Sequence, residues 1–285
     1  STLKTNQGPK LVTSSPAFSN DVFRLSDRSS ELGKKIWTAV FDLPGEKVNK
    51  FDEKVMNAFE SLLGELENLG RQGKIDALVV QSGKQDNFIA GADIKLFQAA
   101  KTADEAEKLS AHGQKLLNRW EDLPFVTVVA VNGTCLGGGC EFSLASSAIV
   151  MSDAPSAKIG LPEVLLGVLP GMGGCVRMPT KVGIATALDM ILTGKTLDGT
   201  RAFKSGLVDA LIPQQDFEHY AHIWVAKNLP ALKEGKRLGK EPKLGGMGGM
   251  GGKVLEGTPF GRAMIFKKAR EGVLSKTKGQ YPAPL

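Results

Sequence analysis

The chain has 285 residues, of which 42% are hydrophobic and 23% are charged. This length allows one large domain or two ordinary ones with a sizeable core. No segment approaches the roughly 18 uninterrupted apolar residues of a membrane span, and the polar start STLKTNQGPK lacks the apolar stretch of a secretory signal. We therefore expect a cytoplasmic protein.

The formal charge of +6 is unevenly distributed. Residues 227–285 carry 13 Lys and Arg against 4 Asp and Glu, whereas residues 1–226 carry 23 against 26. A nucleic-acid surface on the main part of the chain is therefore not expected. The basic tail fits a phosphate-bearing small ligand, an acidic partner surface or a contribution to solubility.

Residues that could form disulfides or zinc sites are few: Cys135, Cys140, Cys175, His112, His219 and His222. Three cysteines cannot all pair, and two of them stand beside glycines in segments that look buried. The only close histidine pair has no cysteine near it. We expect no disulfide framework and no metal site.

The hydrophobic pattern alternates between strand and helix periods over the first two thirds of the chain. Residues 1–33 are mixed and polar, and the expected elements after them are a strand at 36–42, a helix at 51–69, a strand at 75–82, a helix at 103–122, and strands at 126–132 and 147–153. Beyond residue 183 the pattern is mostly helical, with helices at 184–194, 200–206 and 217–229 and a brief strand at 206–212. This order predicts an α/β fold followed by a helical region.

The stretch 233–253 interrupts this rhythm with basic residues and the run GGMGGMGG. Gly246, Gly248 and Gly251 have the spacing of a dinucleotide-binding fingerprint, but no buried strand precedes them and no acidic residue follows at the required distance. A flexible connection is the better interpretation. An amphipathic helix is expected at 260–274.

Three segments rich in small residues follow expected strands: FIAGAD at 88–93, NGTCLGGGCE at 132–141 and IGLPEVLLGVLPGMGG at 159–174. Small residues before a helix leave backbone N–H groups uncovered, and two such groups aimed at one point form an oxyanion hole. Glu141 and Glu163 could then act as acid and base on one substrate.

Each of these features also has a purely structural explanation. The glycine triplet 137–139 could serve close helix packing, Glu163 could be a solvent-facing loop residue, and Cys140 is better explained as a small buried side chain than as a nucleophile. The occurrence of all three segments in this order favours function.

The segments AGADI (90–94), AVNGTCLGGGCEF (130–142) and IGLPEVLLGVLPGMGG (159–174) resemble the signatures of the crotonase superfamily, the enoyl-CoA hydratases and isomerases. The similarity runs from about Ile36 to Leu211. KIGLPE, GGCVRMP and KGQYPAP are similar to the amino-terminal hydratase part of the bacterial fatty-acid oxidation α-subunit. This resemblance implies repeated ββα units that form a spiral core, a helical carboxyl-terminal region, and assembly as trimers or hexamers.

The resemblance also implies roles for individual residues. The amides of Ala90 and Gly138 would form the oxyanion hole for a thioester carbonyl, Glu141 would deprotonate water, and Glu163 would exchange the proton at the α carbon. The implied substrate-binding residues are Gly91, Ala92, Asp93, Lys47 and Lys50, with the adenine end of coenzyme A near residues 43–51 and with Lys267 and Lys268 as weaker candidates.

The expected function is hydration of trans-2-enoyl-CoA in fatty-acid β-oxidation, with Δ3,Δ2-enoyl-CoA isomerisation as a second activity that the resemblance allows. No separate cofactor is expected, because coenzyme A is part of the substrate. Expected partners are further copies of the chain and a thiolase or a dehydrogenase.

We divide the chain into a catalytic core at 1–226 and a basic segment at 227–285. Two alternatives stay open: a crotonase-like scaffold that binds RNA or a protein, and another reaction of coenzyme A thioesters on the same fold.

Overall fold

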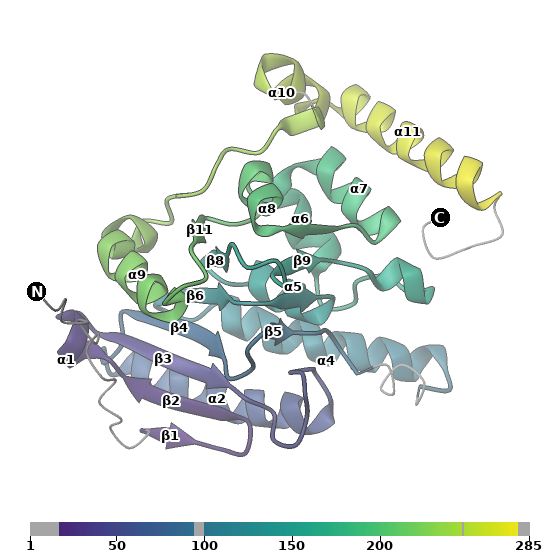
Figure 1. Ribbon diagram of the computed structural model, residues 1–285. Helices are drawn as coiled ribbons and strands as arrows, with labels where there is room; N and C mark the ends of the chain where they lie inside the picture. The colour runs from purple at the N-terminus through teal and green to yellow at the C-terminus, as the bar shows by residue number, and fades with distance from the viewer. Residues whose placement is uncertain (1–16, 94–99, 247, 279–285) are drawn as a thin grey trace, which may run out of the picture.

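The computed structural model describes residues 17–93, 100–246 and 248–278, and its centre is a seven-stranded sheet (Figure 1). The strands are, in spatial order, β1 (Phe18–Ser19), β2 (Phe23–Asp27), β3 (Ile36–Phe41), β4 (Ala77–Ser82), β6 (Val126–Val131), β8 (Ala148–Ser152) and β11 (Ala210–Ile212). The strands from β3 to β11 are parallel, and β1 and β2 are antiparallel additions at one edge.

A smaller sheet lies at the carboxyl ends of these strands. Its order is β10 (Thr196–Asp198), β9 (Lys158–Gly160), β7 (Thr134–Leu136) and β5 (Asn87–Ile89). Three times, a strand of the main sheet is followed by a strand of the small sheet and then by a helix: β4, β5 and α4 (Ala103–Glu121); β6, β7 and α5 (Gly138–Leu144); and β8, β9 and α6 (Gly174–Val182). The expected ββα repeats of an α/β, crotonase-like fold are therefore confirmed.

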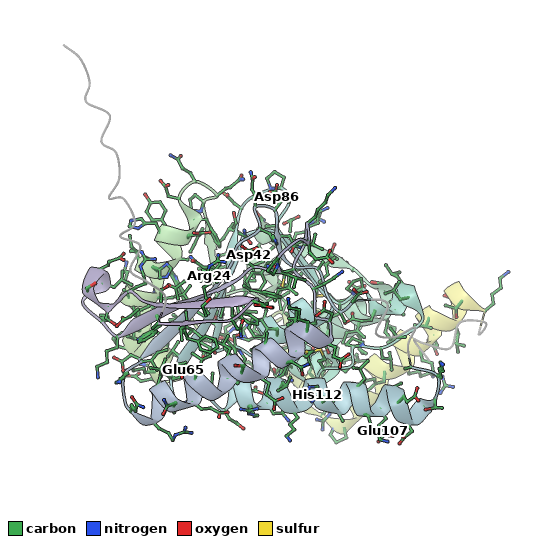
Figure 2. The ribbon with its side chains drawn as sticks, turned by 90° about the horizontal axis from the view of Figure 1, so that it is seen from below. Arg24, Asp42, Glu65, Asp86, Glu107 and His112 are labelled. Carbon is green, nitrogen blue, oxygen red and sulfur yellow. The ribbon has the colours of Figure 1, made fainter. Side chains whose placement is uncertain are left out.

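Helices cover both faces of the main sheet. The helices α2 (Glu53–Arg71) and α4 share one layer, and Figure 2, which looks at this layer from below, shows α2 with Glu65 beside α4 with Glu107 and His112. The other face packs against α9 (Phe217–Lys233). Successive residues of each strand point to opposite faces, so buried strands flanked by two helical layers are apolar on both sides.

The long helices form where the sequence provides both a cap and an apolar stripe. Asp52 accepts a hydrogen bond from the amide of Val55 at 2.8 Å, and Thr102 accepts one from the amide of Glu105 at 3.2 Å. These side chains satisfy amides that have no partner inside the helix. The apolar stripe of α2, predicted from its spacing, is buried throughout: Val55, Met56, Phe59, Leu62, Leu63, Leu66 and Leu69.

The remaining helices follow the second sheet or flank the core. They are α1 (Ser29–Leu32), η1 (Glu163–Leu166), α7 (Ile184–Thr193), α8 (Gly199–Ser205), η2 (Leu244–Gly246), α10 (Gly249–Gly257) and α11 (Pro259–Thr277). Figure 1 shows α10 and the yellow α11 together beyond α7, on the side of the molecule away from α2. The helical carboxyl-terminal region was expected, and the structure contains it.

Two expectations about elements need correction. The polar stretch before residue 33 contains β2, which pairs with β3 along its whole length. The glycine-rich run, expected to be a flexible connection, contains the start of α10 at Gly249. Its anchor is Glu256, whose carboxylate accepts hydrogen bonds from the amides of Ile184 at 2.8 Å and Gly245 at 2.5 Å. This contact joins segments far apart in sequence.

The proposed division at residue 226 falls inside α9, and Leu229 and Leu232 of that helix are buried against the same sheet face as Val225. No helix of the described ranges is long and apolar enough to cross a membrane. Within those same ranges, no group of three or more His, Cys, Asp and Glu side chains is arranged to hold a metal ion.

Candidate active site

The three glycine-rich segments meet around one cavity of about 110 Å³. Ala90, Gly91 and Ala92 come from the loop after β5; Gly137, Gly138 and Glu141 come from the β7–α5 junction; Pro162 and Glu163 come from the segment after β9. Apolar side chains from α2, α4 and the loop after η1 complete the wall, among them Met56, Leu109 and Val168. The small sheet brings the segments together, because its strands β5, β7 and β9 run parallel and all end at this cavity.

Glu141 projects from the first turn of α5 and is only 2% exposed. Its Oε1 accepts hydrogen bonds from the amides of Met172 at 2.8 Å and Gly174 at 2.7 Å. Burial raises the pKa of this carboxyl, and the two amides act in the opposite direction because they stabilise the ionised form. The amides also fix where the carboxylate points.

Glu163 is the first residue of η1 and is 8% exposed. Both of its carboxyl oxygens are buried, and neither has a hydrogen-bond partner within the described part of the chain. Burial, followed by the charge of Glu141, raises the pKa of Glu163 to about 7. The two carboxyl groups therefore differ in environment. Glu141 is held by two amide donors, whereas Glu163 is poised to carry a proton near neutral pH.

The glycine triplet has a specific reason at two positions. Gly137 has φ 53° and ψ −126°, and a Cβ there would lie 3.4 Å from Oε1 of Glu163. A Cβ on Gly139 would lie 2.5 Å from the carbonyl oxygen of Ile89, so this glycine allows α5 to approach β5. The triplet therefore serves both packing and the cavity, and the two explanations left open by the sequence both apply.

One of the two expected amide donors is wrong. The N–H of Ala90 donates a hydrogen bond to the carbonyl of Asn49 at 2.8 Å and is not available to a ligand. The amide of Ala92 has no partner within the described residues, and its nitrogen lies 3.7 Å from where a Cβ of Gly138 would be. Gly138 is the first residue of α5, so its own N–H has no intrahelical acceptor. The amides of Gly138 and Ala92 are therefore the two candidate donors at this cavity.

The expected substrate-binding residues separate into two groups. Gly91 and Ala92 line the cavity. Asp93 and Lys50 form an ion pair with each other at 3.0 Å, and Lys50 also contacts Glu46 at 3.1 Å. Lys47 is exposed on the same loop. None of these three lines the cavity, so their proposed role concerns a part of the ligand that lies outside it.

The lysines of α11 lie farther along the chain and away from the glutamate pair. Lys268 lines a different cavity, between α7 and α11, and the Lys267 side chain is 78% exposed. Neither residue is among those that line the cavity of Glu141 and Glu163.

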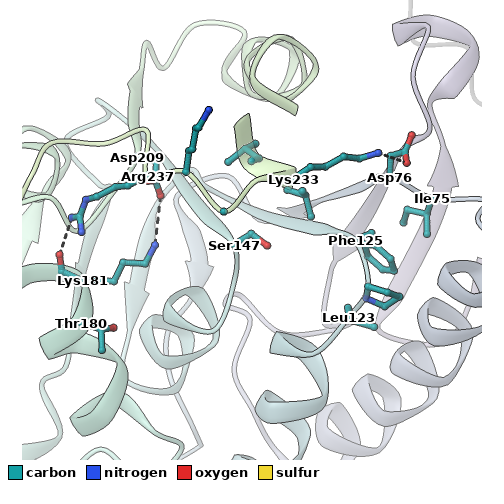
Figure 3. A pocket seen from close by; sticks show the side chains of 15 residues that line it. Ile75, Asp76, Leu123, Phe125, Ser147, Thr180, Lys181, Asp209, Lys233 and Arg237 are labelled. Carbon is teal, nitrogen blue, oxygen red and sulfur yellow. Dashed lines mark hydrogen bonds and ion pairs between the residues drawn. The ribbon is translucent and has the colours of Figure 1, made fainter. Parts of the chain in front are cut away.

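A larger hollow of about 760 Å³ opens at the amino ends of the parallel strands (Figure 3). Several basic side chains line it, but they are engaged: Lys233 pairs with Asp76 at 2.6 Å, and Lys181 approaches Asp209 at 3.8 Å. Ligands of parallel sheets bind at the opposite, carboxyl ends of the strands. Size alone therefore does not identify the site.

Sequence reasoning missed the groups that hold Glu141. The segment 159–174 was singled out for its glycines and Glu163, but the amides of Met172 and Gly174 act as donors to a carboxylate about 30 residues earlier. Backbone donors carry no residue signature, so only the glycine content of GMGG could have pointed to them.

The chain is similar to known proteins over most of its length. Residues 36–236 match the sequence profile of a family described as enoyl-CoA hydratase/isomerase. The chain belongs to the enoyl-CoA hydratase/isomerase family. It is 42% identical over 247 residues to the fatty acid oxidation complex subunit alpha of Aliivibrio fischeri, which covers 87% of this chain and 34% of that protein. The corresponding subunit of Vibrio cholerae is 38% identical over 93% of this chain and 35% of its own length.

The chain thus spans about a third of the length of these relatives. Among solved structures, an enoyl-CoA hydratase from Geobacillus kaustophilus superimposes with a TM-score of 0.67 and 27% identity, over 74% of this chain and 76% of the other. One from Bacillus anthracis has a TM-score of 0.65 at 20% identity, over 92% and 98% of the two chains, and shows the shared fold. The family and the fold expected from the three sequence segments are confirmed.

Proposed function

We propose that this chain hydrates trans-2-enoyl-CoA thioesters. One observation carries the proposal: two buried carboxyl groups with different environments line the same small cavity as the residues of two backbone amides that have no partner among the described residues. An α,β-unsaturated thioester needs this combination, because water attacks the β carbon while negative charge develops on the carbonyl oxygen.

In the proposed mechanism, the amides of Ala92 and Gly138 hold the thioester oxygen and stabilise the enolate. Ionised Glu141 takes a proton from water as the water oxygen bonds to the β carbon. Glu163, protonated near neutral pH because of its raised pKa, gives its proton to the α carbon. One O–H bond of water breaks, one C–O and one C–H bond form, and a proton passes from Glu141 back to Glu163 through solvent to restore the site.

The direct test follows the loss of the conjugated enoyl thioester absorbance with crotonyl-CoA and with longer 2-enoyl-CoA substrates. Glu141→Gln and Glu163→Gln should each lower kcat about 10²- to 10⁴-fold, since each removes an acid–base group and preserves its shape. Glu65→Gln on the outer side of α2 is the matched control and should retain full activity. Absence of turnover with every chain length in the unsubstituted protein rejects the proposal.

The environment of Glu163 supports a second activity. A buried carboxyl group with a pKa of about 7 can both accept and donate a proton near that pH. Such a group could move a proton between the α and γ carbons of a 3-enoyl-CoA, a reaction that needs no water. Glu141→Gln should then impair hydration more than isomerisation, whereas Glu163→Gln should impair both. Equal loss of the two activities in Glu141→Gln would contradict this assignment.

The proposal includes no cofactor, since coenzyme A arrives as part of the substrate. Relatives named as subunits of a fatty acid oxidation complex support a place in β-oxidation. Association with thiolase or dehydrogenase partners, self-assembly into trimers or hexamers and a cytoplasmic location belong to the same proposal. Size-exclusion chromatography with light scattering tests the self-assembly.

A further inference from the structure

The carboxylate of Glu141 depends on a short turn for its position. Met172 and Gly174 donate both of its amide hydrogen bonds, at 2.8 and 2.7 Å, and both lie in the turn 171–174, which ends at the first residue of α6. The turn itself contains three glycines, and Gly173 has φ 109°. Glycine backbone loses more conformational freedom on ordering than any other residue, so such a turn does not hold its shape by local preference.

The guanidinium group of Arg177 lies directly on this turn. Its Nη1 donates a hydrogen bond to the carbonyl oxygen of Met172 at 3.2 Å. A Cβ on Gly173 would come within 2.2 Å of the same nitrogen, so the absence of a side chain there allows the contact. The backbone amide of Arg177 also donates to the carbonyl of Gly173 at 3.0 Å. Arg177 therefore contacts Met172, which is one of the two donors of Glu141, and Gly173, which separates the two donors.

The helix α4 holds Arg177 from the other side. Nε and Nη2 donate to Oε2 of Glu121 at 3.0 and 2.6 Å, and Nη2 donates to Oδ1 of Asn118 at 2.7 Å. The Arg177 side chain is 12% exposed, whereas that of Glu121 is 51% exposed. A planar guanidinium with five donors in a fixed fork can join a helix and a backbone carbonyl rigidly, which a lysine cannot do.

We propose that Arg177 is a positioning residue for the hydration reaction, which it serves by fixing the turn whose amides aim the Glu141 carboxylate at the substrate. The inference rests on the proposed function. The positive charge of Arg177 has a second effect. It lowers the pKa of Glu141, whereas burial raises that pKa. Among the described residues, Glu163, Cys140 and Cys175 are further titratable groups that interact electrostatically with Glu141, and all three are unchanged in the variants below.

Arg177→Met should lower kcat for crotonyl-CoA about 10- to 100-fold, with KM changed less than about threefold, because a misaimed base affects the transition state more than binding. The acid limb of the pH profile of kcat should move to higher pH, since loss of the positive charge raises the pKa of Glu141. Arg177→Lys keeps the positive charge but replaces the three donor nitrogens of the guanidinium with a single nitrogen. Its kcat should fall several-fold, and its acid limb should stay near that of the unsubstituted protein.

Arg119→Met is the matched control. Arg119 also joins α4 to a neighbouring helix, with Nε 3.0 Å from Glu67 and Nη1 3.2 Å from Glu60, but it does not contact the turn. If Arg177 merely joins helices, both Met variants should lose stability alike and keep kcat and the pH profile. A folded Arg177→Met with unchanged kcat and acid limb overturns the proposal. If Arg177→Met does not fold, an unchanged kcat in Arg177→Lys overturns it.

A titration independent of turnover separates this inference from the proposed function. With ¹³C-labelled glutamate side chains, the Glu141 carboxyl resonance, assigned through Glu141→Gln, should titrate at higher pH in Arg177→Met than in the unsubstituted chain. If the unsubstituted chain hydrates no enoyl-CoA, the functional proposal fails, and this shift alone decides whether Arg177 controls the Glu141 carboxylate. An unchanged Glu141 titration in folded Arg177→Met would show that Arg177 does not influence the Glu141 carboxylate, and it would overturn the inference.

Discussion

At the scale of single residues, the cost of burying Glu163 predicts a pH-dependent stability. Its pKa is about 7 in the folded protein against an ordinary value of 4.5, so the folded state binds this proton more tightly than the unfolded state. The free energy of unfolding should therefore fall as pH rises from about 4.5 to 7 and then level off. The loss from this one group is up to about 3 kcal/mol.

Glu163→Gln removes the ionisable group and should remove this loss. The variant should be more stable than the unsubstituted protein at pH 8, and the difference should shrink toward zero as pH falls to about 4.5. Urea unfolding at several pH values measures it. Glu107→Gln, at an exposed position of α4, should show no such pH-dependent difference. A Glu163→Gln variant that is equally stable at pH 8 would indicate that the native carboxylate is solvated.

Residues of the site that act through their side chains could be predicted from the sequence more readily than residues that act through a backbone amide. Glu141 and Glu163 could be proposed from the sequence because carboxylates near glycine-rich segments form a recognisable pattern, whereas the role of Gly138 was implied by the family resemblance. Ala90 was chosen in place of Ala92 because an amide's availability depends on pairing with a distant segment. Here the carbonyl of Asn49 accepts the Ala90 amide, whereas the Ala92 amide has no acceptor in the part of the chain that the structure describes. No local sequence pattern indicates which of the two amides pairs with the 49–51 segment.

At the scale of elements, Glu256 acts as a cap supplied from outside its helix. Gly183, which precedes α7, has no side chain with which to cap it. Glu256 of α10 instead accepts the amides of Ile184 at 2.8 Å and Ala185 at 3.3 Å. A carboxylate at a helix amino terminus also interacts favourably with the helix dipole.

Glu256→Ala should lower the free energy of unfolding by about 1–2 kcal/mol, the usual cost of a lost cap, or release α10 and α11 locally. Hydrogen exchange should accelerate at the amides of Ile184, Ala185 and Gly245 and along both helices. Glu271→Ala on α11, whose carboxylate approaches Lys267 at 4.0 Å, provides the control and should leave these amides protected. Unchanged exchange in Glu256→Ala would show that apolar contacts alone hold α10.

Two properties explain which elements could be predicted from the sequence: the length of the element, and how far along the chain its contact partners lie. Helices with an apolar stripe, such as α2, and buried strands of five or six residues, such as β4 and β6, carry enough periodicity to be recognised. The three-residue strands β5, β7 and β9 are too short for any period and form only by pairing with one another. The helix α10 was missed for a similar reason, since its glycines have low helix propensity and its anchor lies on α7.

At the scale of the whole molecule, the packing of α9 predicts a larger cooperative unit than residues 1–226. Leu229 and Leu232 share an apolar cluster with Val225 of the same helix and with Val79 and Val128 of the main sheet. The opposite face of that sheet supports the helices and loops around the glutamate cavity. We therefore expect residues up to Lys233 to unfold together with the core.

Ligand-linked hydrogen exchange tests this unit. Butyryl-CoA has the thioester but no double bond, so it can occupy the proposed site without being hydrated. At about 100 times its Kd it should add about 2.7 kcal/mol to the free energy of any opening that destroys the site. If the last turn of α9 opens only with the core, butyryl-CoA should slow hydrogen exchange at the amides of residues 229–233 as much as at those of β6. This is expected although no residue of α9 lines the cavity. Protection that stops near residue 226 would instead support a boundary within the helix, because the two parts of α9 would then open separately.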